Sequence, residues 1–307
     1  MRTMITNTGW ILALLCVGVL SILIANVDAL AQPYQRSEVL HPNIKFGFKD
    51  FKFAEESSQE QTKNNTATQF NIHYAYAGDT QKPGVLFVHG TPGGWGAFER
   101  YLSDTNLQED FFMVSVDRMG WGLSDLKKSK IGGDFDLQAK SIVAIMRDYP
   151  TKKWTIVGHS LGASIAPQIA LANSESIDTL LLLAGSLNPK LGGPRWYNWA
   201  ASTWVVSRLI GESMRHSNRE IMALKSELKQ MDEELKKTTL DVDLAIMQGA
   251  TDKLVSPKNP SYVVNQWKSS FASIELIELP NEGHFLPWRQ TPLVIKTIYS
   301  LRAARNN

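Results

Sequence analysis

A serine between two glycines is the first residue of this sequence whose type and setting could do chemistry. Ser160 stands in the pentapeptide Gly-His-Ser-Leu-Gly (158–162), directly after the apolar run 154–157 and before a segment with helical periodicity. A serine hydroxyl is a poor nucleophile unless a sharp turn between a strand and a helix exposes it beside a base. Glycines suit such a turn because neighbouring backbone comes too close for a side chain. We therefore predict that Ser160 is a nucleophile.

Six histidines are available to supply the base that such a serine needs. Four of them precede the serine or lie within its turn: His41, His73, His89 and His159. His216 lies in a charged, polar segment, where a solvated surface histidine is the simpler interpretation. His284 follows the last strand-like run, so a loop at the carboxyl end of a parallel sheet could carry it over Ser160. By position and elimination, His284 is the predicted general base.

The base in turn needs a carboxylate that fixes its tautomer and stabilises the imidazolium. Asp252 follows the apolar run 244–248, which places it at the same predicted edge of the sheet as His284. Glu282, two residues before His284, remains the substitute candidate. Asp252 could instead be an acid at the start of a helix. The predicted triad therefore runs in the order Ser160, Asp252, His284.

Negative charge that develops on a carbonyl oxygen needs fixed donors, and two backbone NH groups can supply them. The NH of Leu161, at the start of the helix after Ser160, is the first candidate. The second lies in the segment His-Gly-Thr-Pro-Gly-Gly (89–94), where glycines let the backbone turn inward. We choose the NH of Thr91. A plain glycine-rich turn is the competing interpretation, and the G-x-G-x-x-G spacing of dinucleotide sites is missing.

The elements that must position these residues alternate along the chain. Two strands with alternating apolar residues come first, at 46–53 and 69–77. Six short, nearly continuous apolar runs follow, at 85–88, 111–116, 154–157, 179–184, 244–248 and 274–279. Helical segments fit between or after them, at 136–149, 161–172, 257–269 and 291–302. This alternation predicts an α/β fold with a doubly wound, mostly parallel sheet that is buried on both faces.

One interval, 186–239, departs from the alternation. It begins with prolines and glycines, contains Trp196, Trp199 and Trp204, and ends in a charged helix. In that helix apolar residues recur at spacings of three and four from 221 to 235, which places them on one face. A coiled-coil partner could use this stripe, but we expect it to pack against the rest of its own domain.

Composition excludes some classes of function. The 307 residues include 43% hydrophobic side chains, enough for a substantial core, and carry a formal net charge of +2. That charge is too balanced for the electrostatic footprint that nucleic-acid binding requires. Nothing in the sequence calls for a metal or an organic cofactor, so we expect neither. The single cysteine, Cys16, lies in the amino-terminal leader, so thiolate chemistry is not expected of the rest of the chain.

The first 31 residues differ from the rest. Arg2 precedes an uncharged apolar stretch, 10–27, and Ala-Leu-Ala (29–31) follows before Gln32. That order predicts a signal peptide over 1–31 and export to the periplasm or the medium. The alternative is an uncleaved anchor, because 10–27 approaches the roughly 20 apolar residues that span a membrane. In that case the protein would associate with the membrane through 10–27.

Five motifs resemble, in order, the signatures of the α/β-hydrolase fold family. They lie at 89–93, 117–124, 158–162, 249–252 and 283–284, and the resemblance covers about 45 to 303. It implies a hydrolase core over 32–185 and 240–307 and a helical cap over 186–239, inserted after the sixth strand. In that family the serine is the nucleophile, the later Asp and His complete the triad, and the residue after His-Gly gives an oxyanion NH. The Asp-Arg segment that begins at Asp117 is usually structural.

The same resemblance shapes the expected function. Trp196, Trp199 and Trp204 would line or cover an apolar substrate pocket, or would join the cap to the core. Relatives that open epoxides or remove halides carry Asp as nucleophile, so Ser160 argues against both activities. We predict an exported serine hydrolase that cleaves an ester or related acyl bond of a small, apolar substrate. A carbon-carbon or amide hydrolase, and a binding protein that keeps the fold without catalysis, are the alternatives.

Overall fold

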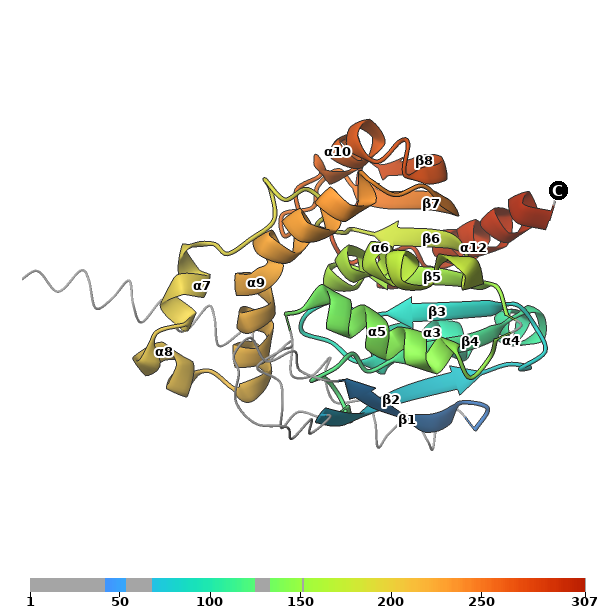
Figure 1. The fold of residues 1–307 in the computed structure, drawn as a ribbon, viewed down its shortest axis with the longest axis horizontal. Helices are drawn as coiled ribbons and strands as arrows, with labels where there is room; N and C mark the ends of the chain where they lie inside the picture. Colours follow the sequence, from blue (N-terminus) through green and yellow to red (C-terminus); the bar gives the residue numbers. More distant parts are fainter. Residues whose placement is uncertain (1–41, 54–67, 125–132, 151, 307) are drawn as a thin grey trace, which may run out of the picture.

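An eight-stranded sheet forms the centre of the protein (Figure 1). The computed structural model describes residues 42–53, 68–124, 133–150 and 152–306. The predicted signal peptide, 1–31, therefore lies outside the described residues, as does the apolar stretch 10–27. Within the described ranges, no helix has both the length and the apolar character that crossing a membrane requires.

The strands run in the order β1-β2-β4-β3-β5-β6-β7-β8 across the sheet. Their bounds are β1 Lys45–Phe53, β2 Thr68–Ala77, β3 Gly84–Val88, β4 Phe112–Val116, β5 Trp154–His159, β6 Ile177–Leu183, β7 Leu240–Gly249 and β8 Phe271–Leu279. Strand β2 pairs antiparallel with both β1 and β4, and every other pair is parallel. The predicted doubly wound, mostly parallel sheet is confirmed.

Register brings the ends of the parallel strands to one edge of the sheet. Val88 at the end of β3 lies opposite Gly158 of β5, and His159 lies opposite Leu183 at the end of β6. At the other side, Gly249 ends β7 opposite Leu279, which ends β8. The loops after β3, β5, β7 and β8 therefore leave the sheet at the same edge, where ligands of open α/β sheets bind.

Helices cover both faces of the sheet and create two apolar cores. One core packs under α5 (Phe135–Met146), α6 (Leu161–Asn173), α9 (Glu212–Leu235) and α10 (Asn259–Gln266). The other lies under η1 (Trp95–Phe98), α3 (Glu99–Leu102), α4 (Thr105–Asp110), α11 (Leu286–Arg289) and α12 (Thr291–Asn306). The strand side chains alternate between these cores, so the central strands are buried on both faces, as their continuous apolar runs predict.

The short helices between β3 and β4 were not predicted from the sequence. Helix α3 has four residues and α4 has six, which is too short for a 3.6-residue periodicity to repeat. Helix α4 starts at a cap instead, because the side chain of Asp104 accepts a hydrogen bond from the NH of Leu107 at 2.9 Å.

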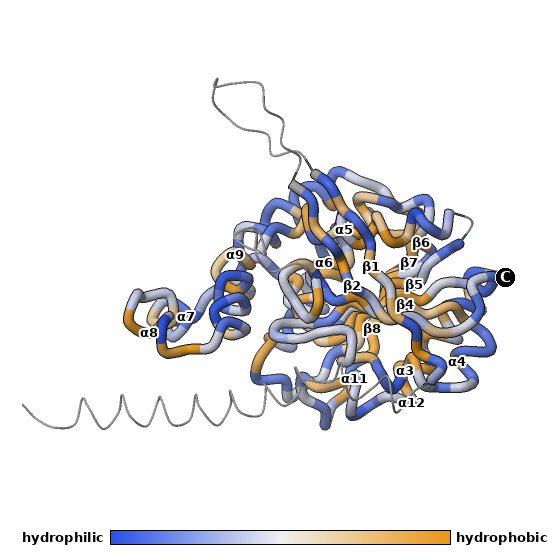
Figure 2. The backbone as a smooth tube through the Cα atoms, turned by 90° about the horizontal axis from the view of Figure 1, so that it is seen from below, coloured by the Kyte–Doolittle hydropathy of each residue, from blue (hydrophilic) through white to orange (hydrophobic). Residues whose placement is uncertain are grey.

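The interval 186–239 forms three helices between β6 and β7: α7 (Trp196–Ala201), α8 (Trp204–Leu209) and α9. Leu224, Leu228, Met231 and Leu235 of α9 are buried in the core under that helix. The predicted packing of this stripe against its own domain is confirmed. Helices α7 and α8 instead project beyond the sheet on the far side of α9, as two views show (Figures 1 and 2).

Candidate active site

Ser160 occupies a sharp turn between β5 and α6. Its backbone angles are φ 54° and ψ −118°, a region that residues other than glycine rarely adopt. The NH of Ser160 donates to the carbonyl of Leu183 at 2.9 Å, which continues the β5–β6 ladder up to the turn. The strained turn therefore rests on a rigid sheet, and its first helical residue follows at once.

Close backbone approach explains the two glycines of the pentapeptide. A Cβ on Gly158 would lie 2.6 Å from the carbonyl oxygen of Gly162. A Cβ on Gly162 would overlap the carbonyl oxygen of Val88 at the end of β3. Both positions must lack a side chain, because the start of α6 lies directly against the neighbouring strand.

Asp252 and His284 form a buried hydrogen-bonded pair after β7 and β8. Nδ1 of His284 lies 2.8 Å from Oδ2 of Asp252, and the two residues are 8% and 6% exposed. When Nδ1 carries the proton and donates it to the carboxylate, the lone pair of Nε2 is left to accept a proton. The structure thus brings together two of the three predicted triad residues in the geometry of a general base and its carboxylate.

The carboxylate of Asp252 accepts four hydrogen bonds. Besides His284, Oδ2 accepts from the amide of Gln248 at 3.2 Å, and Oδ1 accepts from the NH groups of Leu254 and Val255 at 2.8 and 2.9 Å. Burial raises the pKa of Asp252, but the hydrogen bond and charge of His284 together with the two NH groups outweigh burial and lower that pKa overall. Asp252 therefore stays ionised beside the imidazole.

His159 supports the loop that carries His284, a role that the sequence did not reveal. Its Nε2 donates to the carbonyl of His284 at 3.0 Å, and the two rings lie 4.9 Å apart. Burial and the neighbouring His284 lower the pKa of His159 to about 3, so it is a neutral donor. Thr251 also ties the loop down, because its hydroxyl donates to the carbonyl of Glu282 at 2.7 Å.

The substitute carboxylate, Glu282, is turned away from the imidazole. Its side chain accepts hydrogen bonds from Nε of Arg289 at 2.8 Å and from the amide of Gln290 at 2.7 Å. Asp252 alone of the two candidates reaches His284, as its position after β7 predicts.

Two backbone NH groups lie beside Ser160 without a protein acceptor in the described ranges. Leu161 is the first residue of α6, where helical NH groups have no partner within the helix. Thr91 follows Gly90, and a Cβ on Gly90 would lie 2.9 Å from the Cβ of Ser160. Both Leu161 and Thr91 line the pocket above Ser160. Both residues predicted to supply the oxyanion donors therefore line the same pocket as the nucleophile.

Arg118 holds the loop that contains Thr91. Its Nε and Nη2 donate to the carbonyls of His89 and Gly90, each at 2.9 Å. His89 adds a bond from Nδ1 to the carbonyl of Gly90 at 2.7 Å, and burial together with the charge of Arg118 keeps its pKa well below 6.5. In a trans peptide the NH opposes the C=O, so fixing the Gly90 carbonyl on Arg118 directs the Thr91 NH away from Arg118.

Glu220 of α9 balances the charge of Arg118. Its two carboxylate oxygens accept from Nη1 and Nη2 of Arg118 at 2.7 and 3.2 Å, and Trp121 donates its indole NH at 3.1 Å. Both charged side chains are fully buried. A helix of the 186–239 interval thus stabilises the oxyanion loop through one ion pair.

Asp117, which the family resemblance marks as structural, has no atom in the pocket. Its carboxylate accepts from the NH groups of Trp95 and Leu123 at 2.7 and 3.0 Å and contacts Nδ1 of His73 at 2.8 Å. These bonds fold the loop after β4 beneath the oxyanion loop.

A pocket of about 400 Å³ opens above the nucleophile. All five residues predicted for the triad and the oxyanion donors line it: Thr91, Ser160, Leu161, Asp252 and His284. The rest of the wall is mixed: polar side chains such as Ser186, Asn198 and Ser217 share it with six apolar ones, Leu191, Met214, Ile221, Leu224, Leu254 and Val255. Arg195 and Lys253 bring positive charge to the same wall.

The three tryptophans predicted to contact substrate do not reach this pocket. Trp196, Trp199 and Trp204 are 72%, 60% and 68% exposed and none of them lines it. They do not join the cap to the core either. Their neighbours Tyr197 and Asn198 face the pocket, because successive residues of α7 point to different sides of that helix.

His216 is buried and not, as expected, a solvated surface residue. It is 1% exposed and packs on Trp121, with ring centroids 4.8 Å apart. Burial lowers its pKa, Glu220 opposes that effect, and the charge of Arg118 adds to it. The inward face of α9 packs on the loop after β4, a contact that the charged sequence around His216 conceals.

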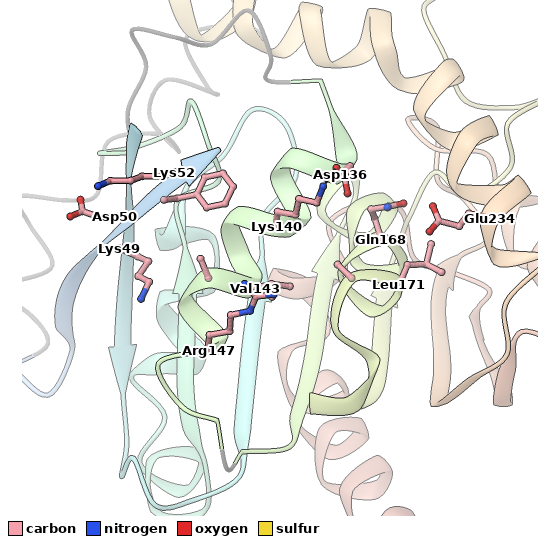
Figure 3. Close-up of a pocket in the computed structure, with 13 residues that line it drawn as sticks. Lys49, Asp50, Lys52, Asp136, Lys140, Val143, Arg147, Gln168, Leu171 and Glu234 are labelled. Atoms are coloured by element: carbon pink, nitrogen blue, oxygen red, sulfur yellow. Dashed lines mark ion pairs between the residues drawn. The ribbon is translucent and has the colours of Figure 1, made fainter. Parts of the chain in front are cut away.

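A second hollow lies away from the triad, between β1, α5 and α6 (Figure 3). It is larger, about 570 Å³, and is lined mainly by long charged side chains of both signs, including Lys49, Asp136, Lys140 and Glu234. Lys140 pairs with Asp136 at 2.6 Å, and Lys49 pairs with Asp148. Its lining contains no hydroxyl or imidazole that could act as nucleophile or base, so the pocket at Ser160 is the candidate site.

In the described part of the chain, no cluster of His, Cys, Asp and Glu side chains could hold a metal ion.

Comparisons with known proteins point to one fold family. Residues 83–203 match the family model described as alpha/beta hydrolase fold. Epoxide hydrolase 4 of Mus musculus is 29% identical over 112 residues, which are 36% of this chain and 31% of that protein. The 2-hydroxy-6-oxononadienedioate/2-hydroxy-6-oxononatrienedioate hydrolase of Burkholderia vietnamiensis is 30% identical over 130 residues, which are 41% of this chain and 43% of that protein. The matched region spans less than half the length of these relatives.

Solved structures share the architecture at low identity. The 2-hydroxy-6-oxo-6-phenylhexa-2,4-dienoate hydrolase of Rhodococcus sp. strain RHA1 superposes with a TM-score of 0.61 and 17% identity, over 84% of this chain and 100% of that one. A laboratory-evolved variant of potato epoxide hydrolase gives 0.59 and 17%, over 76% and 96%. At such identities the likeness concerns the fold.

Proposed function

We propose, on the basis that this chain has the α/β-hydrolase fold, that it is a serine hydrolase that cleaves an ester or related acyl bond. One observation carries the proposal: the buried pair of Asp252 and His284 lines the same pocket as Ser160 on its strained turn. A hydroxyl, an imidazole and a carboxylate at one pocket are the parts of a nucleophile with an oriented general base.

The first half-reaction forms an acyl-enzyme. Nε2 of His284 takes the hydroxyl proton of Ser160 while Oγ attacks the carbonyl carbon of the substrate. The resulting oxyanion accepts hydrogen bonds from the NH groups of Leu161 and Thr91. The carbon–oxygen bond to the alcohol then breaks, and His284 gives its proton to the departing alcohol. In the second half-reaction, water loses a proton to His284 and attacks the acyl carbon. The bond between that carbon and Oγ then breaks, the acid leaves, and His284 returns the proton to Oγ of Ser160.

Ser160 and His284 make no direct hydrogen bond within the described residues. We expect that bond to form when a substrate fills the pocket, because catalytic hydrogen bonds in ligand-free enzymes are often long and tighten in the complex. Asp252 already fixes the tautomer of His284 that this bond requires.

Epoxide opening, the activity in the names of some relatives, does not suit this nucleophile. A carboxylate that opens an epoxide gives an ester, which water can hydrolyse. The hydroxyl of Ser160 would give an ether, which water does not hydrolyse near neutral pH. Acyl transfer is the reaction that regenerates Ser160.

A second candidate is the hydrolysis of a carbon-carbon bond next to a ketone in an anionic substrate. The same base and oxyanion donors serve it, and relatives named as dioate hydrolases share this fold. The specific observation in its favour is the positive charge that Arg195 and Lys253 bring to the pocket wall. A carboxylate on the substrate would pair with them. The apolar side chains in the same wall, such as Leu191 and Val255, suit the acyl chain of a neutral ester instead.

Two measurements test the proposal. Ser160→Ala should abolish hydrolysis of p-nitrophenyl esters that the wild-type protein cleaves, and a fluorophosphonate should label the wild type but not the variant, because only an activated serine reacts. Full activity in Ser160→Ala would refute the mechanism. An unlabelled and inactive wild type would favour a binding protein. Comparing neutral esters with carboxylated ketones then decides between the two substrate classes.

We further propose that the protein is exported, on the basis of the sequence of its leader. Cleavage after Ala31 would give a mature chain that begins at Gln32. Amino-terminal sequencing of the protein from its native cell tests this. An intact leader in the membrane fraction would favour the anchored alternative through 10–27.

A further inference from the structure

Helices α7 and α8 display a set of large apolar side chains to solvent. We call residues 196–209 the aromatic arm. Its exposed apolar residues are Trp196, Trp199, Trp204, Val205 and Leu209, each at least 60% exposed. With about 200 Å² per indole side chain, the three tryptophans alone present roughly 400 Å². That area lies within the range of the largest apolar patch on a typical monomer, and such a patch is often functional.

The arm turns its polar side inward. Asn198 is buried, accepts from the NH of Arg195 at 2.8 Å and donates to Asn218 of α9 at 2.9 Å. The amide of Asn218 donates in return to the carbonyl of Asn198 at 3.1 Å and to the hydroxyl of Ser202 at 2.9 Å. A helix that buries its amides and exposes its indoles is fixed in that rotation, because turning it would break these buried bonds.

The second half of the arm is anchored in the same way. Arg215 of α9 donates to the carbonyls of Ser207 and Ile210 at 3.0 and 2.7 Å, and these bonds hold the end of α8. No residue of α8 itself is buried. These bonds to α9 therefore hold the exposed apolar side chains of the arm in a fixed place in the fold.

The charged residues of the arm and of the segment before it are all basic, and the first acidic residue after the arm is the exposed Glu212. No Asp or Glu occurs between Asp178 and Glu212 in the sequence, whereas this interval contains Lys190, Arg195 and Arg208. All three cations are exposed, and the guanidinium of Arg208 lies 4.1 Å from the ring centre of Trp204. Cations that flank exposed indoles are complementary to an anionic surface with an apolar interior.

We propose that the aromatic arm docks the protein on a membrane that contains anionic lipids. Tryptophan is favoured at the membrane interface, and basic side chains beside it pair with lipid phosphates. A second copy of this chain is a poorer occupant, because a two-fold contact through the arm would bring the same cations together. Tyr197 of the arm and Arg195, which lies directly before the arm, also line the pocket at Ser160. Docking therefore places the pocket beside the lipid.

The test reads the arm itself, so a leader that inserts in the same vesicle does not confuse it. In a full-length Cys16→Ser chain, Val205→Cys places a nitrobenzoxadiazole label within the arm, and Val264→Cys on α10 places the control label. On vesicles of equimolar phosphatidylcholine and phosphatidylglycerol, emission at position 205 should rise about twofold or more as the label leaves water. Emission at position 264, which is 37% exposed, should not change.

Matched variants separate the apolar and the charged contributions. Trp196→Ser, Trp199→Ser and Trp204→Ser together should remove the rise, with an unchanged melting temperature because these side chains are exposed. Lys190→Gln with Arg208→Gln should weaken the binding to anionic vesicles that the label at position 205 reports by roughly 30-fold, from the usual contribution of two cations near such a surface.

Three results would overturn the proposal. The first is no rise at position 205 on anionic vesicles. The second is an equal rise on pure phosphatidylcholine, which would leave the cations without a role. The third is a rise without vesicles that grows with protein concentration and disappears in the tryptophan variant, which would identify a second copy of the chain as the occupant.

Discussion

Oε1 of Glu220 lies 2.7 Å from Nη1 of Arg118, and both side chains are fully buried. The two residues are 102 positions apart, one on α9 and the other in the loop after β4. Since Arg118 also holds the carbonyls of His89 and Gly90, this ion pair connects the inserted helix to the loop that offers the Thr91 NH. The geometry of the loop that offers the Thr91 NH therefore depends on a residue of α9.

Glu220→Gln should destabilise the protein, because it leaves the charge of Arg118 buried without a counter-ion. We expect the free energy of unfolding to fall by about 3 kcal/mol, the lower end of the range for a broken buried pair. Urea denaturation measures it. Glu233→Gln is the matched control on the same helix, since Glu233 makes only an exposed pair with Lys229, and it should change stability by less than about 0.5 kcal/mol.

The double variant Arg118→Met/Glu220→Leu separates stability from positioning. Apolar residues of similar size often replace a buried ion pair without loss of stability, so part of the stability that Glu220→Gln loses should return. The carbonyls of His89 and Gly90 would still lack their donor, so ester hydrolysis should stay at least about tenfold below wild type through kcat. Recovery of both stability and kcat would show that Arg118 does not position the oxyanion loop.

Asp252→Asn should lower kcat by about 10⁴, because an amide at this position favours the wrong tautomer of His284. Glu282→Gln is the control, since Glu282 bonds to Arg289 and Gln290 and not to the imidazole. It should keep kcat within about twofold of wild type. Steady-state kinetics on an activated ester checks both, and the reverse ranking would assign the carboxylate role to Glu282.

Gly162→Ala should destabilise the protein by about 3 kcal/mol, because the added Cβ overlaps the carbonyl oxygen of Val88. Gly211→Ala, before α9, has nothing within 4 Å of the new Cβ. The substitution at Gly211 lowers stability because it removes a favoured N-cap residue, and it raises stability because the unfolded chain becomes less flexible. The two effects should offset each other to within about 0.5 kcal/mol in the free energy of unfolding. Equal unfolding midpoints for the two variants would contradict the close approach of α6 to β3.

Stability should fall as the pH drops below 6.5, partly through His159. Burial and His284 lower its pKa from 6.5 to about 3, so the unfolded chain binds the proton more readily. The contribution of this group is therefore complete above pH 6.5 and is lost as the pH falls toward 3, at up to about 1.4 kcal/mol per pH unit. His159→Gln, which keeps a donor for the His284 carbonyl, should flatten the decline between pH 6.5 and 5. The free energy of unfolding is measured by urea denaturation at each pH. If it falls with pH equally in the variant and the wild type, this assignment is refuted.

The triad residues that the sequence predicts all lie within five residues after the end of a strand. Ser160, Asp252 and His284 each come after an apolar run, and parallel pairing forces the ends of those runs to one edge. Local sequence therefore determines their place. The two glycines around Ser160 follow from the same turn, where the structure shows the backbone contact that excludes side chains.

Contacts across the interval 186–239 could not be predicted in this way. Glu220 and His216 lie among charged residues of an amphipathic helix, and only the packing of α9 on the loop after β4 makes them buried. The prediction that the three tryptophans contact substrate or the core was wrong for the opposite reason. Large apolar residues are usually buried, but Asn198 and Asn218 take the inward positions of the arm and leave the indoles outside.

The four donors around Asp252 have a consequence for how protons move during turnover. Every lone-pair direction of that carboxylate is taken by His284, Gln248, Leu254 or Val255, so neither solvent nor a shared proton has a place on it. Each step of turnover then transfers only one proton, which the imidazole of His284 carries between Oγ of Ser160 and the departing group. In mixtures of light and heavy water, the rate of the acylation step should accordingly vary in a straight line with deuterium content.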